Sequence, residues 1–103
     1  MSNIPEINAE ELQEVLDSNK EITIIDVRED EEVKQGVIPT AEHIPLGNIP
    51  EAVSSLDQNK KYVMVCRSGR RSMNASEFLK ENGFQQVQNL KGGMLAWNGE
   101  LVF

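Results

Sequence analysis

The chain has 103 residues, of which 39% are hydrophobic, and its formal net charge is −7. This size fits a single domain spanning residues 1–103, and the acidic balance argues against nucleic acid or an anionic membrane as a partner. The polar N-terminus shows no signal pattern, and no apolar run approaches the roughly 20 residues of a membrane span. One cysteine permits no internal disulfide and no cysteine-based metal site. We therefore expect a reducing compartment, the cytoplasm, and no bound metal.

The first half of the chain alternates amphipathic stretches with short apolar runs. Asn8 predicts a helix N-cap, and Glu11 completes a capping-box pattern three residues later. The β-branched run 22–25 predicts a buried strand. The acidic stretch 29–35 predicts a short helix that stops at a glycine, and 41–45 predicts a short strand closed by proline.

The second half repeats this alternation. Pro50 predicts the start of a helix, and 62–65 predicts a second buried strand that runs straight into Cys66. A helix is expected over 72–82 and a weaker strand over 86–90. A glycine pair then predicts a tight turn before a last short helix.

Alternating strands and helices predict an α/β fold: a small, mostly parallel sheet of about five strands with helices on both faces. In such sheets ligands bind beyond the carboxyl ends of the strands. Asp26 and Cys66 each follow a predicted strand. We therefore expect the functional site at this edge.

The segment after the second buried strand has the composition of an anion-binding loop. An isolated cysteine at a strand end is usually an inert apolar residue. Here it is followed by Arg67, Ser68, Gly69, Arg70, Arg71 and Ser72. A following helix N-terminus, the arginine charges, the serine donors and a loop able to curl around glycine all favour a thiolate, the reactive form of cysteine. We interpret Cys66 as a nucleophile.

Residues 66–72 (Cys-Arg-Ser-Gly-Arg-Arg-Ser) resemble the active-site loop of the rhodanese family of sulfurtransferases. Three further segments resemble motifs of this family in the same order: 26–29, 36–46 and 90–97. The chain departs from the family pattern at Val37, Thr40 and His43, where the family has histidine, glycine and asparagine. Four motifs in order are far more specific than any one of them, and the resemblance implies a rhodanese-like fold.

The resemblance implies a thiosulfate sulfurtransferase that needs no cofactor. The Cys66 thiolate would attack the outer sulfur of a small anionic donor such as thiosulfate and release sulfite. The resulting persulfide would pass its sulfur to cyanide, a cellular thiol or a protein acceptor. Since the chain has one cysteine, the acceptor must be another molecule.

The resemblance also implies roles for neighbouring residues. The backbone of 67–71 would cradle the outer sulfur, Arg71 would hold the loop in place, and Arg67 would steer the donor. Asp26 is either a partner of Arg71 or a simple turn or cap residue. Arg28 is expected to pair structurally with Glu31 or Glu32, and His43 is given no role.

Two alternatives use the same cysteine. A phosphatase or arsenate reductase also surrounds an anion with a cysteine loop. However, four residues separate Cys66 from Arg71, one fewer than in loops of the tyrosine phosphatase type, and no second thiol is present. The other alternative is a non-enzymatic persulfide carrier or binding module in sulfur trafficking. The sequence leaves this second alternative open.

Overall fold

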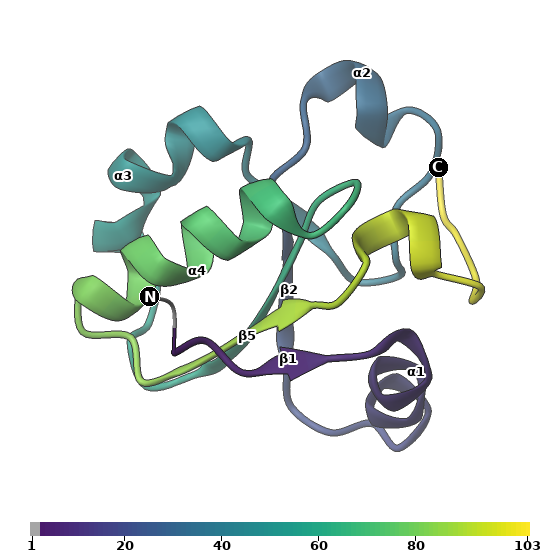
Figure 1. Ribbon diagram of the computed structural model, residues 1–103, viewed down its shortest axis with the longest axis horizontal. Coiled ribbons are helices and arrows are strands. Elements are labelled where there is room, and N and C mark those ends of the chain that lie inside the picture. Colours follow the sequence, from purple (N-terminus) through teal and green to yellow (C-terminus); the bar gives the residue numbers. More distant parts are fainter. Residues whose placement is uncertain (1–2) are drawn as a thin grey trace.

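The computed structural model describes residues 3–103. Its centre is one sheet, with helices packed around it (Figure 1). Every strand pair is parallel, and the strand order is β1-β5-β4-β2-β3. The strands are β1 (Glu6–Ile7), β2 (Thr23–Asp26), β3 (Glu42–His43), β4 (Lys61–Val65) and β5 (Gln86–Leu90). The predicted α/β class and the five strands are confirmed.

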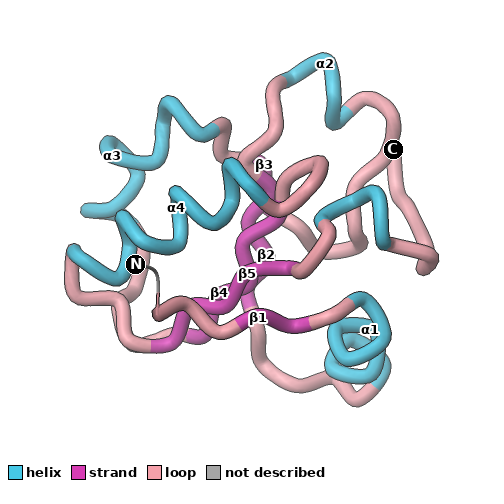
Figure 2. Tube along the Cα trace, in the orientation of Figure 1, coloured by secondary structure: helices cyan, strands magenta, loops and turns pink. Residues whose placement is uncertain are grey.

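Helices cover both faces of the sheet, as expected from the sequence (Figure 2). Alternate residues of β4 face opposite sides: Tyr62 and Met64 pack with α4, whereas Val63 and Val65 pack with α1. The covering elements are α3 (Ile49–Ala52) and α4 (Arg70–Glu81) on one face, and α1 (Ala9–Asp17) with the 3₁₀ turn η3 (Gly93–Ala96) on the other. Within residues 3–103, no helix is long and apolar enough to cross a membrane.

Element boundaries shift where local geometry overrides the sequence pattern. The Asn8 capping box is confirmed, with the Glu11 N–H donating to the Asn8 side chain at 2.8 Å. Helix α4 begins at Arg70 rather than at residue 72, because Gly69 takes a left-handed conformation (φ 99°) and serves as N-cap. The stretch 29–35 forms only α2 (Asp30–Val33), and β1 was not predicted because two residues carry no pattern.

Thr40 occupies a left-handed backbone conformation, with φ 72°, at the position where the family has glycine. A β-branched residue is strained there by about 1–2 kcal/mol. We expect Thr40→Gly to raise the free energy of unfolding by about 1 kcal/mol in urea denaturation. The matched control is Ser54→Gly, an exposed position in the 3₁₀ turn η2 (Val53–Ser55), which should be slightly destabilised. Equal changes at both positions would contradict the strain argument.

Candidate active site

Cys66 lies directly after β4, the middle strand of the sheet, and its side chain is fully buried. The loop behind it turns back over the sulfur. As a result, the Gly69 N–H donates to Sγ at 3.0 Å and the Ser72 hydroxyl lies 3.3 Å from Sγ. Ser72 is in the first turn of α4 and is also buried. The structure therefore places hydrogen-bond donors from the loop and from the helix start around one sulfur atom.

These donors decide the protonation of the thiol. Burial opposes the charged form and by itself would raise the pKa of Cys66. Hydrogen bonds from the Ser72 hydroxyl and from the N–H groups of Ser72, Gly69 and Ser68 outweigh burial and lower the pKa below its ordinary value. The principal causes of the lowered pKa are these donors, whereas the sequence had suggested the arginine charges as well.

A second segment holds the loop from behind. The carbonyl groups of Cys66 and Arg67 accept hydrogen bonds from the N–H groups of Met94 (2.9 Å) and Leu95 (3.0 Å). Gly93 makes this contact possible, because a Cβ atom there would lie 2.5 Å from both carbonyl oxygens. The glycine pair was predicted only as a tight turn. Its contact with the Cys66 loop depends on tertiary structure and had no signal in the sequence.

Arg71 makes a bidentate ion pair with Glu32 of α2, with both N–O distances at 2.7 Å. The prediction that Arg71 holds the loop is thus compatible with its position, since it ties the start of α4 to α2. The suggested pairing of Arg71 with Asp26 is wrong. From the sequence, Glu32 was considered only as a partner of Arg28, because Glu32 and Arg71 are 39 positions apart and no local pattern connects them.

Asp26 instead pairs with Arg28, two residues away, through a buried contact of 2.8 Å. The Arg28 guanidinium also donates to the main-chain carbonyls of Gly36 (2.8 Å) and Glu32 (3.3 Å). The expected ion pair of Arg28 with Glu31 or Glu32 is therefore wrong. This buried pair fixes the segment between β2 and α2 beside the site.

The single histidine lies away from the thiol. His43 is on the edge strand β3, and its Nε2 atom is 2.7 Å from the Arg28 carbonyl oxygen. Among residues 3–103 there is also no group of three or more His, Cys, Asp or Glu side chains that could hold a metal ion. The described site thus contains a thiol and hydrogen-bond donors without an adjacent imidazole.

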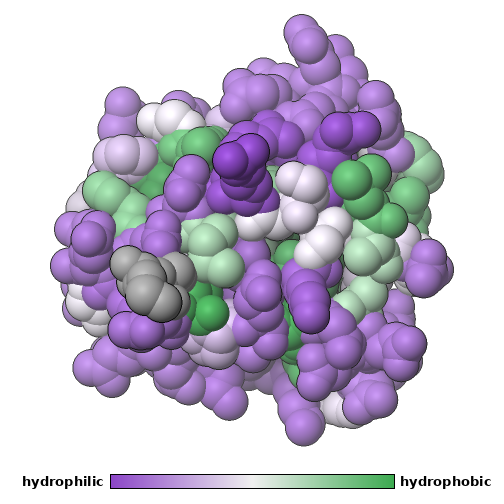
Figure 3. Space-filling model, in the orientation of Figure 1, coloured by the Kyte–Doolittle hydropathy of each residue, from purple (hydrophilic) through white to green (hydrophobic). Residues whose placement is uncertain are grey.

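A cavity of about 280 Å³ borders the loop beside Arg67. Its wall combines the charged side chains of Arg67, Arg28 and Glu32 with the apolar side chains of Met94, Leu95 and Leu101. Leu95, in η3, is 65% exposed. Apolar surface is also visible on the face of the molecule drawn in Figure 3. The approach to the loop is therefore partly positive and partly apolar.

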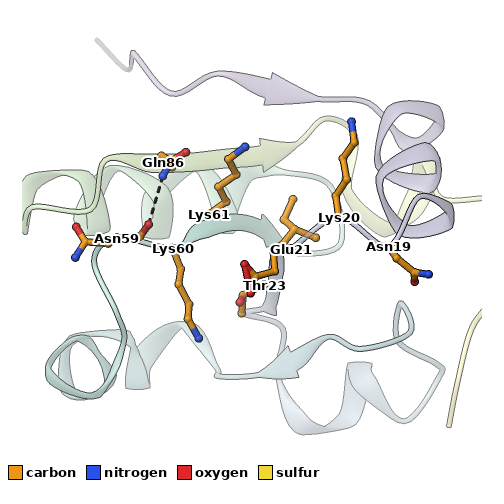
Figure 4. Close-up of a pocket in the computed structure, with 9 residues that line it drawn as sticks. Asn19, Lys20, Glu21, Thr23, Asn59, Lys60, Lys61 and Gln86 are labelled. Carbon is orange, nitrogen blue, oxygen red and sulfur yellow. Dashed lines mark hydrogen bonds between the residues drawn. The ribbon is translucent and has the colours of Figure 1, made fainter.

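A larger cavity, of about 600 Å³, lies at the opposite end of the sheet, where β2, β4 and β5 begin. Three lysines line it, but Lys60 points away from Lys20 and Lys61 (Figure 4). Glu21 lies between them. Because these ammonium groups do not converge, we assign no anion site to this cavity.

The Arg71 ion pair predicts a pH dependence of stability. The hydrogen bond from Arg71 is the main cause that lowers the pKa of Glu32 from 4.5 to about 2. A carboxylate with a depressed pKa stabilises the fold above its unfolded pKa and loses this contribution as the pH falls through the folded value. We expect Glu32→Gln to reduce the free energy of unfolding by about 1 kcal/mol at pH 7, and by progressively less from pH 4.5 down to 2.

Denaturation curves of both proteins across this pH range provide the measurement. Glu31→Gln is the matched control, since Glu31 is exposed and makes no ion pair within residues 3–103. A constant difference between wild type and Glu32→Gln over the whole range would contradict the assignment.

Comparison with known proteins decides the family. Residues 8–100 match the family model described as "Rhodanese-like domain". The chain belongs to the rhodanese family. The predicted resemblance is thereby confirmed over nearly the whole chain.

Individual rhodanese relatives agree with this result. The "Putative sulfurtransferase YtwF" of Bacillus subtilis is 53% identical over 97 residues, covering 94% of this chain and 93% of that protein. The "Thiosulfate sulfurtransferase GlpE" of Shewanella oneidensis is 30% identical, covering 95% and 96%. A crystal structure of a rhodanese-like domain protein from Staphylococcus aureus has a TM-score of 0.90 at 40% identity, covering 97% and 98% of the two chains. Membership in this family supports sulfurtransferase activity as the class of reaction.

Proposed function

We propose that this rhodanese is a thiosulfate sulfurtransferase that carries sulfur as a persulfide on Cys66. The observation that carries the proposal is the buried Sγ atom surrounded by the Gly69 N–H, the Ser72 hydroxyl and further loop N–H groups. These donors favour the thiolate at rest. They are also suited to an anionic sulfur bound to it.

The steps follow from thiolate chemistry. The Cys66 thiolate attacks the outer sulfur of thiosulfate and forms an S–S bond. The bond between that sulfur and the sulfonate group breaks, and sulfite leaves with the electron pair. A nucleophile such as cyanide or a thiolate then attacks the outer sulfur, and the Cys66 thiolate is the leaving group.

The surroundings support a small anionic donor. Arg67 and Arg70 have exposed side chains and make no ion pair within the described residues, so they are free to attract an anion. Arg71 is occupied by Glu32, which argues against a phosphatase whose arginine must bind the phosphate. Because Cys66 must remain a free thiol, we propose a reducing compartment such as the cytoplasm.

The competing function is that of a persulfide carrier, which would use the same loop but require a particular protein acceptor. The test supplies thiosulfate and compares cyanide, small thiols and a reduced dithiol protein as acceptors in parallel. Multiple turnovers with a small acceptor would support the enzyme. Loading of one sulfur per chain without turnover on any small acceptor would favour the carrier.

A further inference from the structure

A buried polar side chain lies on β5, beneath the Cys66 loop. Asn89 is fully buried and lies on the same face of β5 as Val87, which packs in the core beneath α4. A polar residue in such a position must find hydrogen-bond partners within the protein. Each hydrogen-bond partner of the Asn89 side chain belongs either to the Cys66 loop and α4 or to β1.

The amide of Asn89 has a defined orientation. Its Nδ2 atom donates to the Gly69 carbonyl at 3.0 Å and to a Glu6 carboxylate oxygen at 3.1 Å. Both of these partners are acceptors, so the nitrogen must face them and Oδ1 must face Ser72. The strand register brings the Glu6 carboxylate to this amide, because Glu6 and Asn89 are paired residues of the adjacent strands β1 and β5.

The oxygen end of the amide reaches the residue that contacts sulfur. The Ser72 hydroxyl lies 2.5 Å from Asn89 Oδ1 and 3.3 Å from Cys66 Sγ. This hydroxyl has one proton and two acceptors. With a neutral thiol it donates to Asn89 and accepts from the S–H group, and with an anionic sulfur it donates to Sγ. Asn89 thus holds the hydroxyl beside sulfur while the thiol is neutral, and its hold on the Gly69 carbonyl remains when the hydroxyl turns its proton to Sγ.

We propose that Asn89 is a positioning residue for Cys66. It holds the Gly69 peptide, whose N–H is bonded to Sγ, and the Ser72 hydroxyl in place, while Glu6 fixes the amide from β1. The inference extends the function proposed above, since these same donors would hold the persulfide. It does not depend on the sulfur donor, because it concerns the reactivity of the resting thiol.

The test is the pH dependence of Cys66 alkylation by iodoacetamide, which needs no sulfur donor and reports one thiol in this single-cysteine chain. Asn89→Leu removes both N–H donors at similar size and leaves unchanged the surrounding charges: Asp26, Arg28, Arg67, Arg70, Arg71, Glu32 and Glu6. We expect a higher apparent pKa of Cys66 and alkylation at pH 7 slowed about fivefold or more. An unchanged or faster profile would overturn the proposal.

Val87→Ala is the matched control on the same strand and face. It loosens the core without removing a hydrogen bond of the loop, so its alkylation profile should match that of wild type. If Val87→Ala slows alkylation as much as Asn89→Leu does, the effect is general loosening and the positioning role is rejected.

A second variant keeps the proposal testable if Asn89→Leu fails to fold. Glu6→Gln/Asn89→Asp exchanges donor and acceptor between β1 and β5, which preserves a hydrogen bond between the strands. The Gly69 carbonyl then faces a carboxylate instead of an N–H donor. We expect this double variant to unfold cooperatively in urea, as the wild-type protein does, and still to alkylate slowly. Cooperative unfolding together with wild-type alkylation would contradict the proposal.

Sulfur transfer from thiosulfate, measured in parallel, separates this inference from the proposed function. Altered alkylation in Asn89→Leu with no sulfur transfer by the wild-type protein would leave Asn89 as a positioning residue while rejecting the proposed donor. Normal sulfur transfer by the wild-type protein, together with unaltered alkylation of Asn89→Leu, would support the proposed donor and reject Asn89 as a positioning residue.

Discussion

Cys66→Ser is expected to abolish sulfur loading, with the rate of sulfur transfer falling by at least about 10⁴-fold. A serine hydroxyl is a weak nucleophile unless a base removes its proton. The one histidine of the chain is on β3 and bonded to the Arg28 carbonyl. Incubation with thiosulfate should therefore add the mass of one sulfur atom to the wild-type protein, read by mass spectrometry, and add nothing to the variant.

The control for this experiment is the fold of the variant. Serine is close to cysteine in size, so the circular dichroism spectrum and the cooperativity of unfolding should be retained. Removal of the added mass by cyanide would show that it is a transferable sulfur. Sulfur retained by Cys66→Ser would identify another site and refute the role of Cys66.

The second large effect is expected at a residue that takes no part in the chemistry. Gly93→Ala places a methyl group 2.5 Å from the carbonyl oxygens of Cys66 and Arg67, at a residue with φ 57°. The clash and the strained backbone together should lower the free energy of unfolding by about 3 kcal/mol. Because the clash pushes on the Cys66 loop, sulfur transfer should also fall by about 10²-fold.

Gly47→Ala is the matched control for this substitution. A Cβ atom at Gly47 meets nothing within 4 Å, so stability and transfer should change little. Urea denaturation and the thiosulfate assay, performed on both variants below their unfolding midpoints, provide the measurements. Wild-type transfer by folded Gly93→Ala would show that the loop is not held through this contact.

Much of the fold was predictable because its determinants are local. The β-branched run in β2, the apolar run in β4, the Asn8 capping box and the glycine after the acidic stretch each act over a few residues. The two edge strands differed in this respect, although each has only two residues. β3 falls within the predicted strand 41–45, whose end a proline marks, whereas β1 has no pattern of its own and becomes a strand through pairing with β5.

The candidate site also has a part that the sequence predicts and a part that it does not. The Cys66 loop is contiguous, so its residues, its anion-binding composition and its place at a strand end could be inferred from the sequence. The ion pair of Asp26 could not be inferred from the sequence. Its partner is the Arg28 guanidinium, and a sequence pattern does not show whether Arg28 or Arg71 lies closer to the carboxylate.

By itself, the sequence determined an α/β domain of the rhodanese type with one cysteine in a loop before a helix. The tertiary structure alone decided what surrounds that loop: Glu32 beside Arg71, Gly93 behind the Cys66 carbonyl, and Asn89 beneath Ser72. These contacts join residues up to 39 positions apart. They exist only because the carboxyl ends of parallel strands bring separate loops to one edge of the sheet.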